Sequence, residues 1–234
     1  MATHTLVDEE FGEIRIRRIR VSRRVSIRIG TDGRYQATAP LLTPLIFIRR
    51  MIDGSRDDLR QLAEHSSVSS PYEDGQSIGK NHQLAIIFTG MVKQAEASVT
   101  RQRIIIKLPE GQHPSDQSTQ QLIRDTVIKV LRKEAKLLLP LQLKHLSNAH
   151  GFHYIKIRFS HSSGRWGSCT SSGTISLNIA LMKLPDELIE YVLIHELCHT
   201  RQMNHSPAFW EEVKKYDPHY LLHRRQIKKY TPTV

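Results

Sequence analysis

The sequence predicts an α+β fold in two parts, a β-rich N-terminal module followed by a helix-rich domain. Three observations predict it. Apolar and polar residues alternate through much of the first 110 residues, as they do in strands. Apolar residues recur at helical spacing in the segments that begin near residues 120 and 185. Polar and turn residues fill the stretch 111–119, so we place the boundary there and expect domains at 1–116 and 117–234.

Length and composition indicate a globular protein. The chain has 234 residues, of which 39% are hydrophobic and 24% are charged. No segment approaches the roughly 20 apolar residues of a membrane span, and the first 20 residues contain no secretory core, so we expect a cytoplasmic protein with no membrane partner. The two cysteines exclude a disulfide scaffold. The net charge of +11 favours anionic partners, including nucleic acid.

The N-terminal module begins with a basic, strand-like segment. Residues 14–29 alternate isoleucine and valine with arginine, which predicts a strand with one apolar and one strongly basic face. The turn residues 31–33 and the segment 34–39 predict a second strand. The remaining predictions for this module are a helix at 43–63, a polar linker at 66–75, and strands at about 82–89 and 97–108.

The C-terminal part begins with a long amphipathic segment. We expect a helix from Gln120 to about Leu139, with Pro140 ending or kinking it. A second helical piece reaches His150, where Gly151 is a suitable stop. The remaining predictions are strands at 154–159 and 173–179 and helices that start near 185, 207 and 218.

The most informative motif is H-E-x-x-H, formed by residues 195–199. Positions i and i+4 of a helix lie on one face, so His195 and His199 can hold one metal ion together. Glu196 then lies beside the metal, where a base that activates water belongs. The alternative is a pair of ordinary histidines satisfied by hydrogen bonds. The pattern favours a zinc-dependent hydrolase, with a peptidase as the preferred interpretation.

A third histidine supports the metal site. A catalytic zinc ion takes three protein ligands and keeps one position open for water. The residues around His205 predict that the helix ends and the chain turns back, with Pro207 opening the next helix. We therefore expect one Zn²⁺ per chain, bound by His195, His199 and His205. Glu211 and Glu212 are the alternative third ligands.

Several further blocks carry a resemblance to a known family. They are Arg165 to Cys169 (Arg-Trp-Gly-Ser-Cys), Gly173 to Asn178, Leu184-Pro185, Tyr191 to His199, Asn204 to Ser206, Phe209-Trp210 and Asp217-Pro218. With these blocks the chain resembles the YgjP-like metallopeptidase domain, a bacterial relative of SprT-like zinc proteases. The resemblance implies a zincin-like metallopeptidase domain with an HExxH helix, with the three histidines as zinc ligands and Glu196 as the general base.

The sequence departs from related patterns at two places. Ser162, Ser163 and Gly164 stand where the family usually has a basic residue, which puts an anion contact from that position in doubt. Gln202 stands where a metzincin would have glycine, which argues against a metzincin-type turn.

Substrate contacts are expected from the same blocks. The strand at 173–179 is a candidate exposed edge for pairing with an extended peptide, or else an ordinary structural strand. Arg165 is expected to bind a carboxylate or phosphate, or to pair with a core acid. Asn178 is expected to orient substrate or a ligand, or to cap a helix. Trp166 is a candidate substrate contact, although both Trp166 and Trp210 fit core positions better.

Two alternative functions stay open on the sequence alone. The first is a metal-dependent nucleotide hydrolase that attacks phosphoanhydride bonds, although no Gly-rich phosphate loop supports it. The second is a nucleic-acid-associated protein that binds through the arginine-rich segment 14–34. The plain alternative for that segment is a solvated sheet face.

Overall fold

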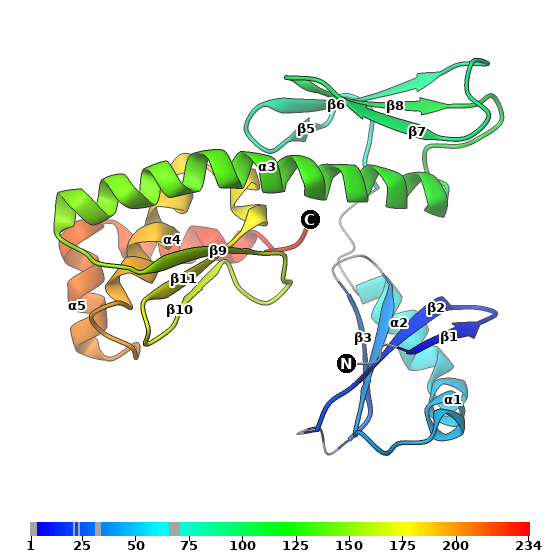
Figure 1. Cartoon of the computed structure of the whole chain (residues 1–234), viewed down its shortest axis with the longest axis horizontal. Coiled ribbons are helices and arrows are strands. Elements are labelled where there is room, and N and C mark those ends of the chain that lie inside the picture. Colours follow the sequence, from blue (N-terminus) through cyan, green and yellow to red (C-terminus); the bar gives the residue numbers. More distant parts are fainter. Residues whose placement is uncertain (1–3, 21, 23, 31–33, 66–70) are drawn as a thin grey trace. The chain divides into compact units, whose positions relative to one another are not determined.

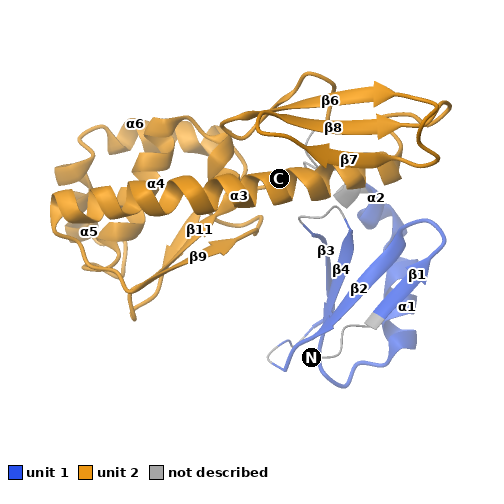
Figure 2. Ribbon diagram, turned by 45° about the horizontal axis from the view of Figure 1, so that its top comes forward, with its two compact units in different colours: residues 1–71 blue, residues 72–234 orange. Residues whose placement is uncertain are grey.

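The computed structural model describes residues 4–20, 22, 24–30, 34–65 and 71–234. They form two compact units, residues 1–71 and 72–234 (Figure 2). Strands and helices mix in an α+β architecture, as the sequence predicts, with a sheet-rich N-terminal part (Figure 1). The predicted turn at 31–33 and residues 66–70 of the predicted linker lie outside the described residues.

The first unit is a sheet covered on one face by helices. The sheet has the order β1-β2-β4-β3. Its apolar face packs Ile14, Ile16 and Ala37 against Ile48 and Ile52 of the helices, all fully buried. The strands are β1 (His4–Asp8), β2 (Gly12–Arg18), β3 (Ser26–Ile29) and β4 (Tyr35–Ala39), and the helices are α1 (Leu45–Gly54) and α2 (Arg56–His65).

Three features of this unit differ from the sequence prediction. The strand expected at 14–29 is two strands, β2 and β3, which lie on opposite sides of β4. The single helix expected at 43–63 is broken at Ser55, where α1 ends and the chain turns into α2. Gly54 precedes this break, and a glycine weakens the helix it stands in. Strand β1 was not predicted, because its short run has no clear alternation and is stabilised by antiparallel pairing with β2.

The second unit is built around one long helix between two sheets (Figure 1). Helix α3 runs from Gln117 to His150 without interruption, so the predicted end at Pro140 is wrong. The first sheet, in the order β5-β6-β8-β7, contains β5 (Ser77–Ile78), β6 (His82–Phe88), β7 (Glu96–Val99) and β8 (Arg103–Leu108). The second, in the order β10-β11-β9, contains β9 (Lys156–Ser160), β10 (Gly167–Cys169) and β11 (Thr174–Asn178).

The first sheet packs on α3, so the two belong to the same unit. Ile104 and Ile106 of β8 share one buried core with Val127 and Leu131 of α3. The boundary expected at 116/117 therefore falls inside the second unit, and the compact units divide at 71/72 instead. The polar stretch that predicted a boundary is the turn that leads into α3.

A buried carboxylate fixes this sheet on the helix. Glu134 of α3 is only 4% exposed, and it accepts hydrogen bonds from the backbone N–H groups of Lys80 and Asn81 at 2.9 and 3.1 Å. His82 Nδ1 contacts the same carboxylate at 2.7 Å. Gly79 adopts φ +62° at this turn, and a Cβ there would meet the Glu134 side chain at 2.1 Å. Only glycine therefore permits this close approach.

The second sheet corrects one expectation about substrate pairing. Strand β11 pairs in parallel with β9 and antiparallel with β10, so it lies in the middle of the sheet. The strand expected at 173–179 is therefore not an exposed edge. Among the described strands of this sheet, β10 is an edge strand, and it packs on helix α4 (Asp186–Cys198), which is followed by α5 (Pro207–Tyr216) and α6 (Tyr220–Gln226). No described helix combines the length and apolar character needed to cross a membrane.

Candidate metal centre

Helix α4 carries the motif and is held on nearly all sides. Asp186 and Glu187 occupy its first turn, where acidic groups interact favourably with the helix dipole. Apolar side chains follow on most sides of the helix, and nine of its thirteen residues are buried. A helix packed this way keeps the positions of its polar side chains closely defined, which is what a metal centre requires.

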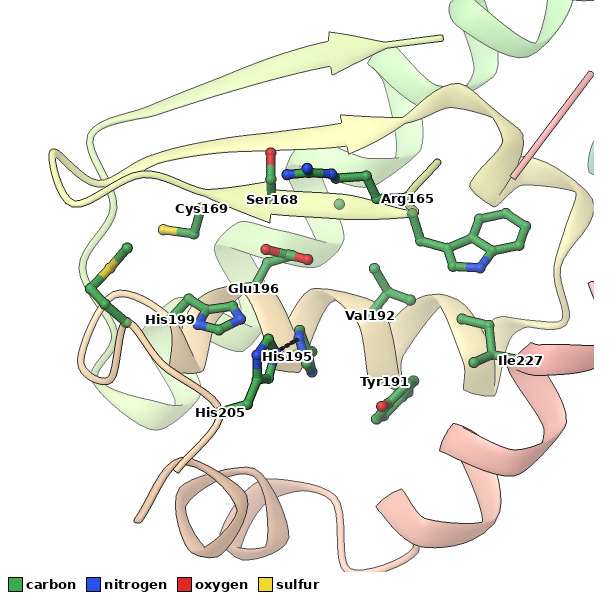
Figure 3. A pocket seen from close by; sticks show the side chains of 13 residues that line it. Arg165, Ser168, Cys169, Tyr191, Val192, His195, Glu196, His199, His205 and Ile227 are labelled. Carbon is green, nitrogen blue, oxygen red and sulfur yellow. Dashed lines mark hydrogen bonds between the residues drawn. The ribbon is translucent and has the colours of Figure 1, made fainter. Parts of the chain in front are cut away.

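The structure brings the three predicted histidines together. The possible ligand atoms of His195, His199 and His205 all lie within 4.8 Å of one another. His195 lies in the last turn of α4, His199 caps it, and His205 lies on the loop before α5 (Figure 3). The Nε2 atoms of His195 and His205 are 3.2 Å apart. Among the described residues, no other group of three or more candidate ligand side chains is found.

Hydrogen bonding defines which nitrogen of His199 faces the cluster. Its Nδ1 lies 3.0 Å from the backbone carbonyl oxygen of Gln202, so this nitrogen carries the proton and donates it. The other nitrogen, Nε2, is then unprotonated, and its lone pair is available to bind a metal ion in the cluster. This arrangement of a ring N–H bonded to a carbonyl is typical of metal-binding histidines. His195 Nδ1 is buried without a hydrogen-bond partner among the described residues.

Burial keeps two of the three imidazoles, those of His195 and His199, in the neutral form. Burial, with smaller contributions from the neighbouring His199 and His205, lowers the pKa of His195 to about 3. Burial also lowers the pKa of His199, against the effect of the Gln202 carbonyl. Both imidazoles are therefore uncharged near neutral pH, and neutral imidazole is the form that binds metal ions.

Glu196 lies beside this cluster in a dry position. It is 4% exposed, and its Oε2 has no hydrogen-bond partner among the described residues. Burial raises its pKa to about 8, and the positive charge of Arg165 opposes that rise. A buried carboxylate with a perturbed pKa in a pocket is a typical feature of an active site.

Aromatic side chains hold the ligands from behind. The ring of His199 stacks on Phe209 at 4.4 Å between centroids, and that of His205 stacks on Trp210 at 5.6 Å. Trp210 in turn stacks on Tyr220 and lies under the guanidinium of Arg224. Trp210 is thus a supporting aromatic packed against the core, in line with the sequence interpretation.

A pocket of about 470 Å³ opens onto the cluster. Arg165 and Trp166 line it, as do Glu196 and the three histidines (Figure 3). Sequence reasoning assigned no role to several other lining residues, because an isolated residue of these types carries no spacing signal. These residues are Gly167, Ser168, Cys169, Tyr191, Val192, Met203 and Ile227.

Asn178 does not line the pocket but holds its wall. It is fully buried, and its Oδ1 accepts the backbone N–H of Ala180, which caps the 3₁₀ turn that follows β11. Its Nδ2 donates to the backbone carbonyls of Ser162 and Arg165 at 2.7 and 3.0 Å. The capping alternative for Asn178 is therefore observed, and its side chain supports the loop that presents Arg165.

The alternative acidic ligands are placed elsewhere. Glu212 pairs with Arg201 and with Lys215 at 2.5 and 2.8 Å, and its pKa is lowered by these contacts, that with Lys215 first. Glu211 is exposed on the same helix. Neither carboxylate joins the cluster of three histidines.

Comparison with known proteins identifies the class to which this site belongs. The family model described as YgjP-like, metallopeptidase domain matches residues 23–230, and the histidine cluster lies within this range. The chain belongs to this family. No curated protein sequence matches the chain.

Two solved structures are similar to part of the chain. One is the metallopeptidase zymogen of Pyrococcus abyssi abylysin, with 28% identity and a TM-score of 0.36 over 39% of this chain and 94% of that chain. The other is the metallopeptidase zymogen of Methanocaldococcus jannaschii jannalysin, with 20% identity and a TM-score of 0.34 over 38% of this chain and 91% of that chain.

Proposed function

We propose that the protein is a zinc-dependent peptidase in which His195, His199 and His205 hold one Zn²⁺ and Glu196 is the general base. The observation that carries this proposal is the convergence of three imidazoles beside a buried carboxylate in an open pocket. The family supports a metallopeptidase. We infer the metal identity and the residue roles from the donor set.

The residues fit a tetrahedral metal ion. Two nitrogens bound to zinc at about 2.1 Å in tetrahedral geometry lie about 3.4 Å apart. The His195 and His205 Nε2 atoms are 3.2 Å apart, close to that value. Three neutral imidazoles with one open position are the donor set of a catalytic zinc site, and the pocket leaves that position accessible.

Glu196 supplies the acid–base chemistry in this proposal. When bound, zinc supplies positive charge that acidifies a water molecule, polarises the scissile carbonyl and favours the ionised form of Glu196. The carboxylate accepts a proton from the attacking water and delivers it to the leaving amine. Its Oε2 is available for this role because no described group bonds to it.

We propose that an extended peptide substrate binds alongside the edge strand β10. Its residues line the pocket, and β11 occupies only one of its two sides in the described sheet. An extended peptide can add to such an edge through backbone hydrogen bonds. A phosphoanhydride substrate fits less well, because the buried Glu196 repels phosphate and the described lining contains one permanent cation.

Replacing Glu196 tests the proposal directly. We expect E196Q to lose peptide hydrolysis by about 10²- to 10⁴-fold, because the general base is gone. It should keep its metal, since the three histidines remain, whereas H205A should bind metal more weakly. Hydrolysis of a peptide library and metal content by mass spectrometry check both points.

The matched control is E190Q, which changes Glu190, an exposed residue earlier on the same helix. It should keep both activity and metal. Full activity in E196Q, or in protein stripped of metal by a chelator, would contradict the proposed mechanism.

A second candidate function rests on the charge distribution of the first unit. Arg15, Arg17 and Arg28 are exposed on the sheet face opposite the helices, where β4 contributes the neutral Gln36 and Thr38. The acids of this unit pair mainly with two arginines on the helix side. These pairs join Arg56 to Asp8, Glu10 and Asp53, and Arg60 to Glu10 and Asp57.

We therefore propose this sheet face as a weak nucleic-acid contact that brings the peptidase to its substrates. Arginines that neutralise phosphates release counterions, so affinity should fall steeply with salt. The double variant R17E/R28E should reduce the salt slope by about one for each phosphate that is no longer neutralised. Binding to a labelled oligonucleotide checks this, with R103E in the second unit as control. Salt-independent binding would remove this candidate.

A further inference from the structure

We propose that Arg165 anchors a carboxylate of the substrate close to the scissile bond, so that the enzyme selects peptides that carry a carboxylate there. This inference rests on the proposed peptidase function. It assigns a specificity role to one side chain and a chemical class to the substrate.

Arg165 is the only permanent cation among the described residues that line the pocket. Its side chain is exposed, and no hydrogen bond or ion pair is found for its guanidinium within the described ranges. In the view of Figure 3 the side chain runs along β10 toward Ser168, with Glu196 and the imidazoles nearby. Arg165, Ser168 and Glu196 all line the same pocket, so Arg165 borders the space that a substrate would fill.

The backbone beneath Arg165 is fixed. The carbonyl oxygen of Arg165 accepts a hydrogen bond from Asn178 Nδ2 at 3.0 Å, and that of Trp166 accepts one from the Asn178 backbone N–H at 2.8 Å. Asn178 is fully buried, so water does not compete for these hydrogen bonds. A charged group on a fixed base recognises a ligand at a lower cost in conformational entropy.

Arg165 lies near the catalytic carboxylate without being neutralised by it. Both residues line the same pocket, so a ligand bound there can lie beside both groups. They form no ion pair in the described part of the chain, where Glu196 Oε2 has no hydrogen-bond partner. All five N–H donors of Arg165 therefore remain for a ligand that lies beside Glu196.

A carboxylate matches this environment better than a larger anion. The planar guanidinium binds a carboxylate through two parallel hydrogen bonds. A doubly charged phosphate at the same place would face Glu196 with a single cation of the described lining to balance it. A peptide offers a carboxylate from two sources, its C-terminus or an aspartate or glutamate side chain next to the scissile bond.

Matched peptides separate the two sources. One neutral peptide sequence is prepared with a free C-terminal acid or an amide, and with glutamate or glutamine at each position that flanks the cleaved bond. Preference for the acid over the amide indicates C-terminal recognition. Preference for glutamate over glutamine in amidated peptides indicates side-chain recognition. Equal kcat/KM for all pairs in the wild-type protein would overturn the proposal.

Variants of Arg165 then test whether this residue causes the preference for a carboxylate. R165M should reduce the carboxylate preference by about tenfold to a hundredfold, since a charge-assisted hydrogen bond is lost, while R165K should retain part of it. R158M, which changes an exposed arginine on β9 of the same sheet, is the matched control. An unchanged preference in R165M would also overturn the proposal.

A binding measurement makes this test independent of catalysis. Calorimetry of the same peptides with metal-free protein should show tighter binding of the carboxylate form to wild type than to R165M. If the wild-type protein cleaves no peptide, the proposed function is wrong. The binding difference between wild type and R165M still tests whether Arg165 binds a carboxylate, and equal binding would contradict that role.

Discussion

Gly167 shapes the candidate site by lacking a side chain. A Cβ at this position would lie 2.6 Å from Glu196 Oε1 and 2.8 Å from Glu196 Cδ. Real atoms do not approach so closely, so any larger residue must displace the carboxylate. The motif containing Glu196 therefore depends on a glycine some thirty residues upstream, on β10, that no local spacing rule connects to it.

We expect G167A to reduce kcat by about 10- to 100-fold, because a shift of the base by about 1 Å is sufficient for such a loss. Metal content should stay at the wild-type level, since the three atoms nearest to this Cβ position all belong to Glu196 and not to a histidine. Steady-state kinetics and metal analysis check both. G164A, in the loop that precedes β10 and with no atom found within 4 Å of its added Cβ, is the control. Wild-type kcat in G167A would show that Glu196 is not held by this contact.

At the scale of elements, periodicity predicted most helices and several strands but not their pairing. Thr174–Asn178 is a strand as expected, yet it lies in the centre of its sheet, and the three-residue strand β10 forms one of the two edges. A strand this short has too few residues for alternation to be read. Its position is set by pairing with β11 and by the close packing of Gly167 on α4.

Helix α3 is a case in which a local sequence signal predicted a break that the structure does not have. Pro140 removes a backbone N–H from the helix interior, which favours a break. The helix continues because both halves are buried against other elements, through Ile123 and Val127 on one side of the proline and Leu143 on the other. Tertiary packing therefore overrides the local preference of one residue.

At the scale of the whole molecule, the chain divides into two units with separate cores. The core of the first unit has eight buried hydrophobic residues among those described, and the buried Asp8 carboxylate pairs with Arg56 at 3.0 Å. Burial alone would raise the pKa of Asp8, but hydrogen bonds from the Phe11 and Glu10 backbone and from Arg56 outweigh it. The net effect lowers this pKa below 3.8.

This shift predicts acid-sensitive stability in the first unit. A carboxylate whose pKa is lowered on folding stabilises the fold above its unfolded pKa, and the contribution is lost as pH falls through the folded pKa. Thermal unfolding of the chain should therefore occur at lower temperature below about pH 4. D8N should flatten this dependence, whereas D58N, at an exposed position on α2, should not. An identical pH slope in D8N would refute this role of Asp8.

The sequence by itself determined the set of chemical groups at the centre, because helical i, i+4 spacing places His195 and His199 on one face and a turn returns His205 to them. It also determined the α+β class, since alternation and helical periodicity are local properties. Only the tertiary structure decided that β10 lies at an edge of its sheet, that Gly167 makes room for Glu196 and that Asn178 holds the loop of Arg165. These depend on contacts between residues far apart in the chain, where the energy of close packing, rather than local preference, selects the arrangement.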